Sequence, residues 1–169
     1  MTNDVVRGYT KLDAGEQIYL ASYGDPVVSF FIPGKPGSKQ SFRFSKSGHR
    51  YQPRSIVDYQ SLVALSALEA MLVSALEAKV APVTYPLDGP LRIRITARFF
   101  IRDSKKAGPK ATRPDFDNIA KPILDGLTAA GVWHDDGQVA SATVDKINVT
   151  GDDSPGVLVE IWRIPALLK

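Results

Sequence analysis

Between residues 91 and 101 the chain alternates apolar and basic side chains. The apolar positions are Leu91, Ile93, Ile95, Ala97 and Phe99, and the arginines are Arg92, Arg94 and Arg98. Successive side chains of a β-strand point to opposite faces, so the segment predicts a strand with one buried face and one wet face. Such a sheet needs other elements packed on its apolar side, and the rest of the chain has to supply them.

A long helix is predicted to begin at Ser55 and to end before Pro82. Ser55 with Asp58 resembles a capping box in which Asp replaces the usual Glu. Behind it, apolar residues recur at helical spacing as far as Val80. The apolar face is broad enough for core packing and for a partner subunit as well, and core packing is the use that the pattern favours.

A second, shorter helix is predicted to begin at Asp117 or Asn118, both good N-cap residues, and to end at Gly131. Pro122 limits where this helix can start, because proline is tolerated only near the first turn. The predicted buried side carries Ile119, Ile123 and Leu127.

The remaining segments read as strands and turns. The predicted strands are 27–32, a hairpin of 40–44 with 50–51, 138–149 and 156–164. With the two helices they indicate an α+β fold, a single domain in which one long and one short helix pack on a mixed sheet. Residues 1–25 show weak periodicity and are predicted to be an N-terminal extension of a domain that covers residues 26–169.

Composition excludes several classes of protein. The chain contains no cysteine, which rules out a disulfide framework, a thiolate nucleophile and a cysteine-based zinc site. No apolar stretch is expected to approach the roughly 18 residues of a membrane span, and the first residues lack the apolar run of a signal peptide. We therefore expect a cytoplasmic protein with no membrane partner.

Positive charge is concentrated in two segments. Residues 33–54 carry six lysines and arginines and no acidic residue, beside the aromatic Phe42, Phe44 and Tyr51. Residues 102–113 add further lysines against one aspartate. Clustered positive charge is typical of proteins that bind a phosphate backbone. The alternative is a solvated surface of loop lysines, and the acid-free, aromatic character of the first segment favours nucleic acid.

Two acidic pairs lie at opposite ends of the short predicted helix: Asp115 with Asp117, and Asp135 with Asp136. Carboxylates that converge in a fold stay ionised together only with a cation among them. Oxygen-only ligands favour a hard ion such as Mg²⁺. The alternative is that these aspartates only cap backbone N–H groups in helix starts and turns. Spacing alone does not decide whether the two pairs meet.

These segments resemble the RusA family of Holliday junction resolvases over residues 30 to 146. The matching motifs are I-P-G-K-P at 32–36 with Lys39 and Arg43, G-P-L at 89–91, R-P-D-F-D-N at 113–118 with Lys121, L-D-G-L at 124–127, V-W-x-D-D-x-Q-V at 132–139, and Lys146. The P-D-x-D-N-x-x-K and D-D-x-Q-V blocks at this separation carry the resemblance. Residues 1–25 have no counterpart in the family pattern, and the loop 102–112 varies.

The resemblance implies a homodimer that cuts four-way DNA junctions with Mg²⁺, for which Mn²⁺ is a substitute, by paired symmetric nicks in DNA recombination and repair. It implies Asp115, Asp117 and Asp136 as metal ligands, with Lys121 essential at the reaction centre. Asp135 is then expected to support Asp136. No small-molecule cofactor is expected. The predicted contacts to the DNA backbone are Lys35, Lys39, Arg43, Arg113 and Lys146.

Three alternatives stay open at this point. Lys121 could form a plain helix-surface pair with Asp117, worth about 0.3–0.5 kcal/mol. The chain could be a metal-dependent nuclease of another specificity, for flaps, single strands or RNA, or a DNA-binding protein without catalysis. His49 and His134 are expected to be ordinary exposed or packed histidines, without a role at the metal.

Overall fold

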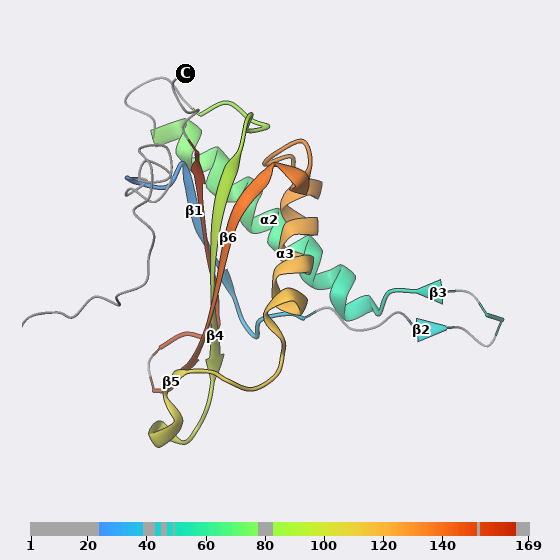
Figure 1. The fold of residues 1–169 in the computed structure, drawn as a ribbon, viewed down its shortest axis with the longest axis vertical. Coiled ribbons are helices and arrows are strands. Elements are labelled where there is room, and N and C mark those ends of the chain that lie inside the picture. Colours follow the sequence, from blue (N-terminus) through green and yellow to red (C-terminus); the bar gives the residue numbers. More distant parts are fainter. Residues whose placement is uncertain are drawn as a thin grey trace, which may run out of the picture.

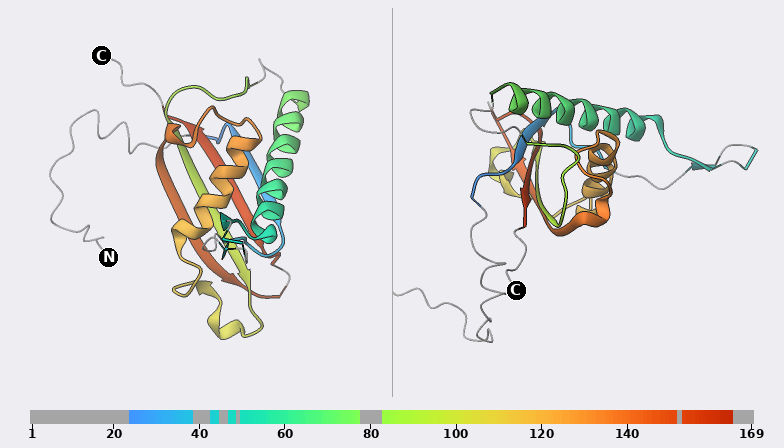
Figure 2. Two further views of the ribbon diagram at one scale, coloured as in Figure 1. Left: turned by 90° about the vertical axis from the view of Figure 1, so that its right-hand side faces the viewer. Right: turned by 90° about the horizontal axis from the view of Figure 1, so that it is seen from above.

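The computed structural model describes residues 24–38, 43–44, 47–48, 50–77, 83–151 and 153–164. A five-stranded sheet in the order β1-β7-β4-β6-β5 forms one layer, and the two α-helices cover one of its faces (Figure 1, Figure 2). The elements of these layers are β1 (Val28–Pro33), α2 (Arg54–Glu77), β4 (Leu91–Phe100), β5 (Gly108–Pro109), α3 (Phe116–Ala129), β6 (Val139–Val149) and β7 (Gly156–Arg163). The mixed sheet and its helices confirm the predicted α+β fold.

Strand β4 lies at the centre of the sheet, antiparallel to β7 and parallel to β6. Its predicted apolar positions are all buried, and they meet the inward side chains of β1 and β7 in the core. The wet face carries the arginines as predicted, and these have partners. Arg94 pairs with Asp145 at 2.9 Å, and Arg98 stacks on the ring of Phe31.

Helix α2 begins one residue earlier than predicted, at Arg54. The carbonyl of Pro53 accepts the first helical bonds, from the backbone N–H groups of Ile56 and Val57. Ser55 therefore lies inside the helix, and the predicted capping box is wrong. Asp58 instead pairs with Arg54 one turn before it, at 3.9 Å.

Two sides of α2 differ in what they contact. The inward side packs on β1 and α3 through Ile56, Tyr59, Val63 and Ala67. The outward side is also apolar: Val57, Leu65, Leu68, Leu72, Val73 and Leu76 are 44–77% exposed.

Residues 54–76 are long and apolar enough to cross a membrane by length and composition alone. The expectation that no segment approaches a membrane span was therefore wrong, since it overlooked how few charges α2 carries.

Helix α3 begins at Phe116, with Asp115 at the N-cap, and so starts earlier than predicted. It ends at Ala129, and Gly131 adopts the left-handed φ of +71° that a helix-ending glycine provides. The predicted end is therefore confirmed. Pro122 lies in the helix interior, not in its first turn, and is buried against the core together with Ile119, Ile123 and Leu127.

Smaller elements complete the chain. The short ribbon of β2 (Arg43–Phe44) and β3 (Arg50–Tyr51) confirms the predicted hairpin in its described part, and it extends away from the sheet (Figure 1). Two 3₁₀ turns, η1 (Ser104–Lys106) and η2 (Asp136–Gln138), precede β5 and β6. The predicted N-terminal extension lies outside the described residues except for Gly24 and Asp25, and stays a prediction.

Candidate functional site

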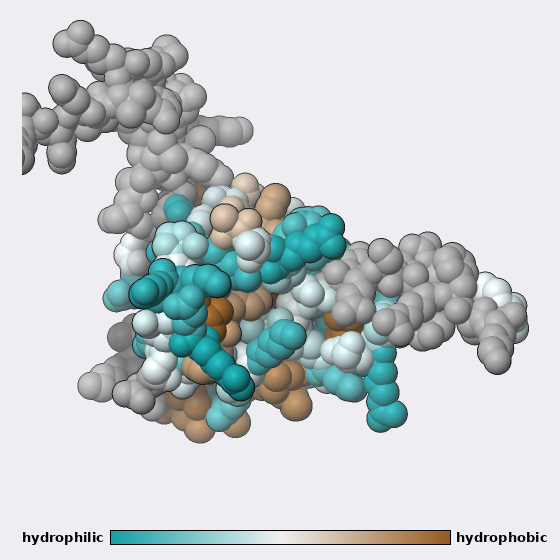
Figure 3. Space-filling model, turned by 90° about the horizontal axis from the view of Figure 1, so that it is seen from below, coloured by the Kyte–Doolittle hydropathy of each residue, from teal (hydrophilic) through white to brown (hydrophobic). Residues whose placement is uncertain are grey.

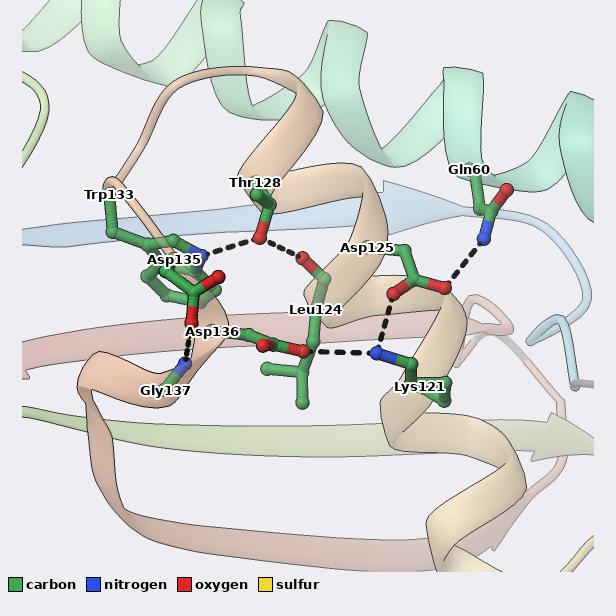
Figure 4. Close-up of polar contacts among 9 residues, drawn as sticks. All are labelled: Gln60, Lys121, Leu124, Asp125, Thr128, Trp133, Asp135, Asp136 and Gly137. Carbon is green, nitrogen blue, oxygen red and sulfur yellow. Dashed lines mark hydrogen bonds and ion pairs between the residues drawn. The ribbon is translucent and has the colours of Figure 1, made fainter.

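The turn after α3 brings the second acidic pair back alongside the helix. Gly131 reverses the chain, and Trp133 is buried to 1% exposure. The indole Nε1 of Trp133 donates to Thr128 Oγ1 at 2.7 Å, which ties the turn to the last part of α3. Trp133 packs into the core, and Asp136 reaches the side of α3 as a result (Figure 4).

Lys121 joins the helix to this returning segment. Its Nζ lies 3.0 Å from Asp136 Oδ2, across 15 residues of chain. The same Nζ lies 2.8 Å from Asp125 Oδ1, one turn further along α3. Lys121 therefore faces the C-terminal part of its helix, and its partners are these two carboxylates, in place of the Lys121–Asp117 pair considered from the sequence (Figure 4).

Asp135 and Asp136 have different surroundings. The carboxylate of Asp135 accepts a hydrogen bond from the backbone N–H of Gly137 at 2.7 Å, and Gln138 completes a capping box from the other side. The amide of Gln138 also donates to the carbonyl of Leu87. Asp135 thus fixes the turn η2, while the half-buried carboxylate of Asp136 is left to face Lys121.

The charge of Lys121 is stabilised by its surroundings. Hydrogen bonds to Asp125, and then to Asp136, raise the pKa of Lys121, and they outweigh the opposing effect of partial burial. A raised pKa keeps the ammonium charged throughout the neutral range. The site therefore holds a permanent cation between two carboxylates.

The first acidic pair lies at the other end of α3. Asp115 is the N-cap residue, yet its side chain makes no capping hydrogen bond, and Asp117 is exposed in the first turn. The alternative that Asp115 serves only as a cap is therefore not supported. Negative charge at a helix N-terminus is favourable, so both carboxylates are tolerated there without an ion-pair partner among the described residues.

A cavity of about 730 Å³ opens beside Asp115 at the end of the sheet where β4 finishes. It is lined by Lys35, Pro36, Ser38, Phe99, Phe100, Ile101, Lys110, Arg113, Pro114, Asp115 and Asn118. Seen from below, this end of the molecule presents apolar patches crossed by hydrophilic side chains (Figure 3). Basic and aromatic groups together suit a nucleotide, because cations meet its phosphate and rings stack on its base.

Two of the predicted DNA contacts line this cavity, Lys35 and Arg113. Lys35 sits on the turn that follows β1. Gly37 fixes this turn against α2, since a Cβ at Gly37 would fall 2.3 Å from the ring of Tyr59. Lys110 contributes a third cation, which lies 5.2 Å from the centroid of the Phe99 ring; the sequence pointed to its loop without selecting it.

Lys146 has backbone partners. Its Nζ donates to the carbonyls of Thr112 and Pro114, both at 3.0 Å. These two carbonyls flank Arg113, and the second belongs to the residue directly before Asp115. Lys146 therefore holds the loop that presents both residues at the cavity.

The predicted ligands suit a divalent ion by their chemistry, since all three are carboxylates and Asp115 and Asp117 stand exposed. A shared metal site also requires that the fold bring these carboxylates together. Across the described residues, no three Asp, Glu or His side chains are gathered closely enough to hold one metal ion. Asp115 lines the basic cavity, whereas Asp117 and Asp136 do not.

Some predicted residues are not placed. Lys39 and His49 lie outside the described residues, and Arg43 is described only by its backbone. His134 is exposed, and its Nε2 lies 3.2 Å from Asp88 Oδ1. An ordinary surface histidine was expected there.

Sequence reasoning missed two residues of this site, Asp125 and Gln60. Asp125 accepts a hydrogen bond on Oδ2 from the Gln60 side chain of α2 at 2.9 Å. The spacing of Asp125 four residues after Lys121 was a usable signal, because side chains at i and i+4 meet on a helix surface. Nothing in the local sequence pointed to Gln60, which lies 65 residues from Asp125.

Fold and site together define a small α+β protein with a lysine between two carboxylates at α3 and a basic cavity that reaches the N-terminal end of the same helix, features expected of an enzyme that acts on nucleic acid. A family model described as endodeoxyribonuclease RusA matches residues 33–162. The chain belongs to the RusA family of endodeoxyribonucleases.

Relatives in bacteria and phages carry related names. A crossover junction endodeoxyribonuclease RusA of Escherichia coli K12 is 30% identical over 124 residues, which cover 73% of this chain and 86% of the relative. A protein of the same name from Enterobacteria phage 82 is 39% identical over 61 residues, 36% of this chain and 43% of the relative. One from Lactococcus phage r1t is 29% identical over 76 residues, 44% of this chain and 56% of the relative.

Proposed function

We propose that the chain is a Mg²⁺-dependent endodeoxyribonuclease that resolves four-way DNA junctions by paired symmetric nicks, in the cytoplasm, during DNA recombination and repair. Family membership and the names of the relatives support the substrate. The observation that carries the proposal is the ion pair of Lys121 with Asp136. It joins the second acidic pair, Asp135 with Asp136, to helix α3, which begins at the first acidic pair, Asp115 with Asp117.

Asp115, Asp117 and Asp136 would hold the divalent ion. Close carboxylates repel one another unless a cation lies among them. A bound divalent ion would therefore draw the three carboxylates together. Bound Mg²⁺, or Mn²⁺ in its place, would supply an activated water and neutralise charge on the phosphate oxygens.

Lys121 would contribute a fixed positive charge. An ammonium beside the scissile phosphate stabilises the negative charge that grows on its oxygens, which is electrostatic stabilisation and requires no proton transfer. The raised pKa of Lys121 suits this role and argues against Lys121 as a general base.

The basic cavity would bind the DNA backbone near the cut. Lys35 and Arg113 line it, and Lys39 and Arg43 follow Lys35 on the same segment. Such contacts make affinity fall steeply as salt rises. The predicted DNA contact of Lys146 stays a prediction, and its two bonds to backbone carbonyls support a role in holding the loop.

The outward apolar face of α2 supports a homodimer. Leu65, Leu72 and Leu76 are each more than 60% exposed, on a helix with few charges. Soluble chains rarely leave such a contiguous face uncovered. A second copy related by a two-fold axis would bury the same face on both chains, and it would supply the second active centre that two opposed nicks require.

A synthetic four-way junction tests the proposal. With Mg²⁺ the native chain should cut it by symmetric paired nicks, with little cutting of linear duplex, flaps or RNA. Asp117→Asn should abolish cleavage and leave junction binding intact or tighter, because one negative charge near phosphate is removed. Full cleavage by Asp117→Asn would exclude the metal mechanism, and binding without cleavage at any Mg²⁺ concentration would indicate a DNA-binding protein without catalysis.

A further inference from the structure

A line of four polar side chains connects α2 to the turn η2 (Figure 4). Gln60 Nε2 donates to Asp125 Oδ2 at 2.9 Å. The other oxygen of Asp125, Oδ1, lies 2.8 Å from Lys121 Nζ. Lys121 Nζ in turn lies 3.0 Å from Asp136 Oδ2. Each oxygen of Asp125 therefore has its own partner, one from α2 and one from α3 itself.

The two carboxylates around Lys121 differ in what else they are expected to do. Asp136 is a proposed metal ligand, so its oxygens would be shared with the divalent ion. Asp125 lies on the other side of Lys121, and its second oxygen bonds an amide. A lysine has a flexible four-carbon stem, so an ammonium with one shared partner needs a second one to stay in place.

The crossing of α2 and α3 puts Gln60 within reach. A Cβ at Gly126 would fall 2.8 Å from the carbonyl oxygen of Gln60 and 2.8 Å from Val63. Only glycine allows this close approach of the two helices. Gly126 follows Asp125 directly, so this close approach lies next to the residue whose carboxylate meets the Gln60 amide.

We propose that Asp125 and Gln60 are positioning residues for Lys121: Gln60 fixes the carboxylate of Asp125, and Asp125 holds the Lys121 ammonium beside Asp136. The inference rests on the proposed function, in which Lys121 acts on the scissile phosphate. An exposed i,i+4 pair on a single helix would need no partner from a second helix. The Asp125 side chain is 31% exposed and is bonded on both oxygens.

The first measurement is single-turnover cleavage of a four-way junction by the full chain with saturating Mg²⁺. Asp125→Asn should slow cleavage by about 10- to 100-fold, because small misplacements of a reacting group have effects of that order. Gln60→Ala should slow it less, and Asp125→Glu should recover part of the rate. Junction affinity and melting temperature should stay native in all three.

Asp145→Asn is the matched control. Asp145 is 36% exposed and pairs with Arg94 on the outer face of the sheet, so the variant removes one comparable carboxylate far from Lys121. Its cleavage rate should be native. Native rates for Asp125→Asn, or rate losses that only follow losses in melting temperature, would overturn the proposal.

A second measurement does not depend on activity. Nitrogen-15 NMR of the lysine ammonium groups reports how ordered each Nζ is. Lys121 should be ordered in the native chain and should become more mobile in Asp125→Asn, in which Asp136 remains as its charged partner. If the native chain cuts no junction, the proposed function fails while this measurement still decides whether Asp125 holds Lys121; an ammonium equally ordered in both chains would overturn the inference.

Discussion

At the scale of single residues, neighbours in the sequence carry different roles. Asp135 and Asp136 look alike in the sequence, yet one carboxylate bonds the backbone of its own turn and the other faces Lys121. The reason is geometric: in the extended N-cap conformation Asp135 points back at Gly137. The structural role and the chemical role are therefore separable by substitution.

Asp135→Ala should lower the free energy of unfolding by about 1 kcal/mol, the usual effect of losing a capping side chain. Asp136→Asn should leave that free energy nearly native, because its pair with Lys121 is partly exposed, and should abolish cleavage. Urea unfolding and junction cleavage measured on both variants check this. A stable and active Asp136→Asn chain would show that Asp136 is not part of the active site.

Local sequence patterns predicted the roles of single residues less well than they predicted the helices and strands. The spacing of Lys121 and Asp125 on one helix was available in advance, and so was the turn chemistry of Asp135. The bonds from Gln60 to Asp125 and from Lys146 to the loop before Asp115 were not, since each joins residues 30 or more positions apart. A pairing of that kind depends on how the helices and strands pack.

At the scale of elements, alternation and helical spacing located strands and helices to within a few residues. They did not predict the sheet order β1-β7-β4-β6-β5 or the parallel pairing of β4 with β6, because a strand pattern does not name its partner. They also placed the start of α2 at a serine, whereas the carbonyl of Pro53 begins the helix.

Tyr59 on the inward side of α2 gives an element-scale prediction. Burial raises the pKa of Tyr59 from 10.0 to about 12, and the nearby backbone of Gly37 has a smaller, opposite effect; by distance and angle, the buried hydroxyl makes no hydrogen bond among the described residues. The neutral hydroxyl therefore favours the folded state below pH 10, and this contribution is lost as the pH rises from 10 to about 12.

Tyr59→Phe should consequently be as stable as the native chain or more stable at pH 7, since an unpaired buried hydroxyl is removed. It should also lose less stability than the native chain between pH 10 and about 12. Urea unfolding at pH 7 and near pH 11 measures both. A loss at pH 7 above about 1 kcal/mol would show that the hydroxyl has a partner in solution.

At the scale of the whole molecule, α2 has two apolar sides, and the described residues of the chain pack on the inward one. The sequence had left core and partner subunit open as uses of this broad face. In the structure, Ile56, Tyr59 and Val63 lie on the side of α2 that packs in the core. Leu65 and Leu72 lie on its exposed side.

Leu65→Glu with Leu72→Glu should convert a dimer to a monomer in sedimentation experiments, because two charges are introduced into a shared apolar contact and each is repeated by symmetry. The monomer should fold and lose paired nicking. Thr84→Glu, on an exposed loop outside α2, adds the same kind of charge and should stay dimeric. A native chain that sediments as a monomer would contradict the assignment of this face.

The most direct test is whether the two ends of α3 share one divalent ion. Mn²⁺ added to the isotope-labelled chain broadens the NMR signals of residues near the ion. Signals around Asp117 and around Asp136 should broaden together, at the same Mn²⁺ concentration, and Asp117→Asn or Asp136→Asn should abolish both effects. Broadening at one end alone, or at the two ends at separate concentrations, would contradict a shared site.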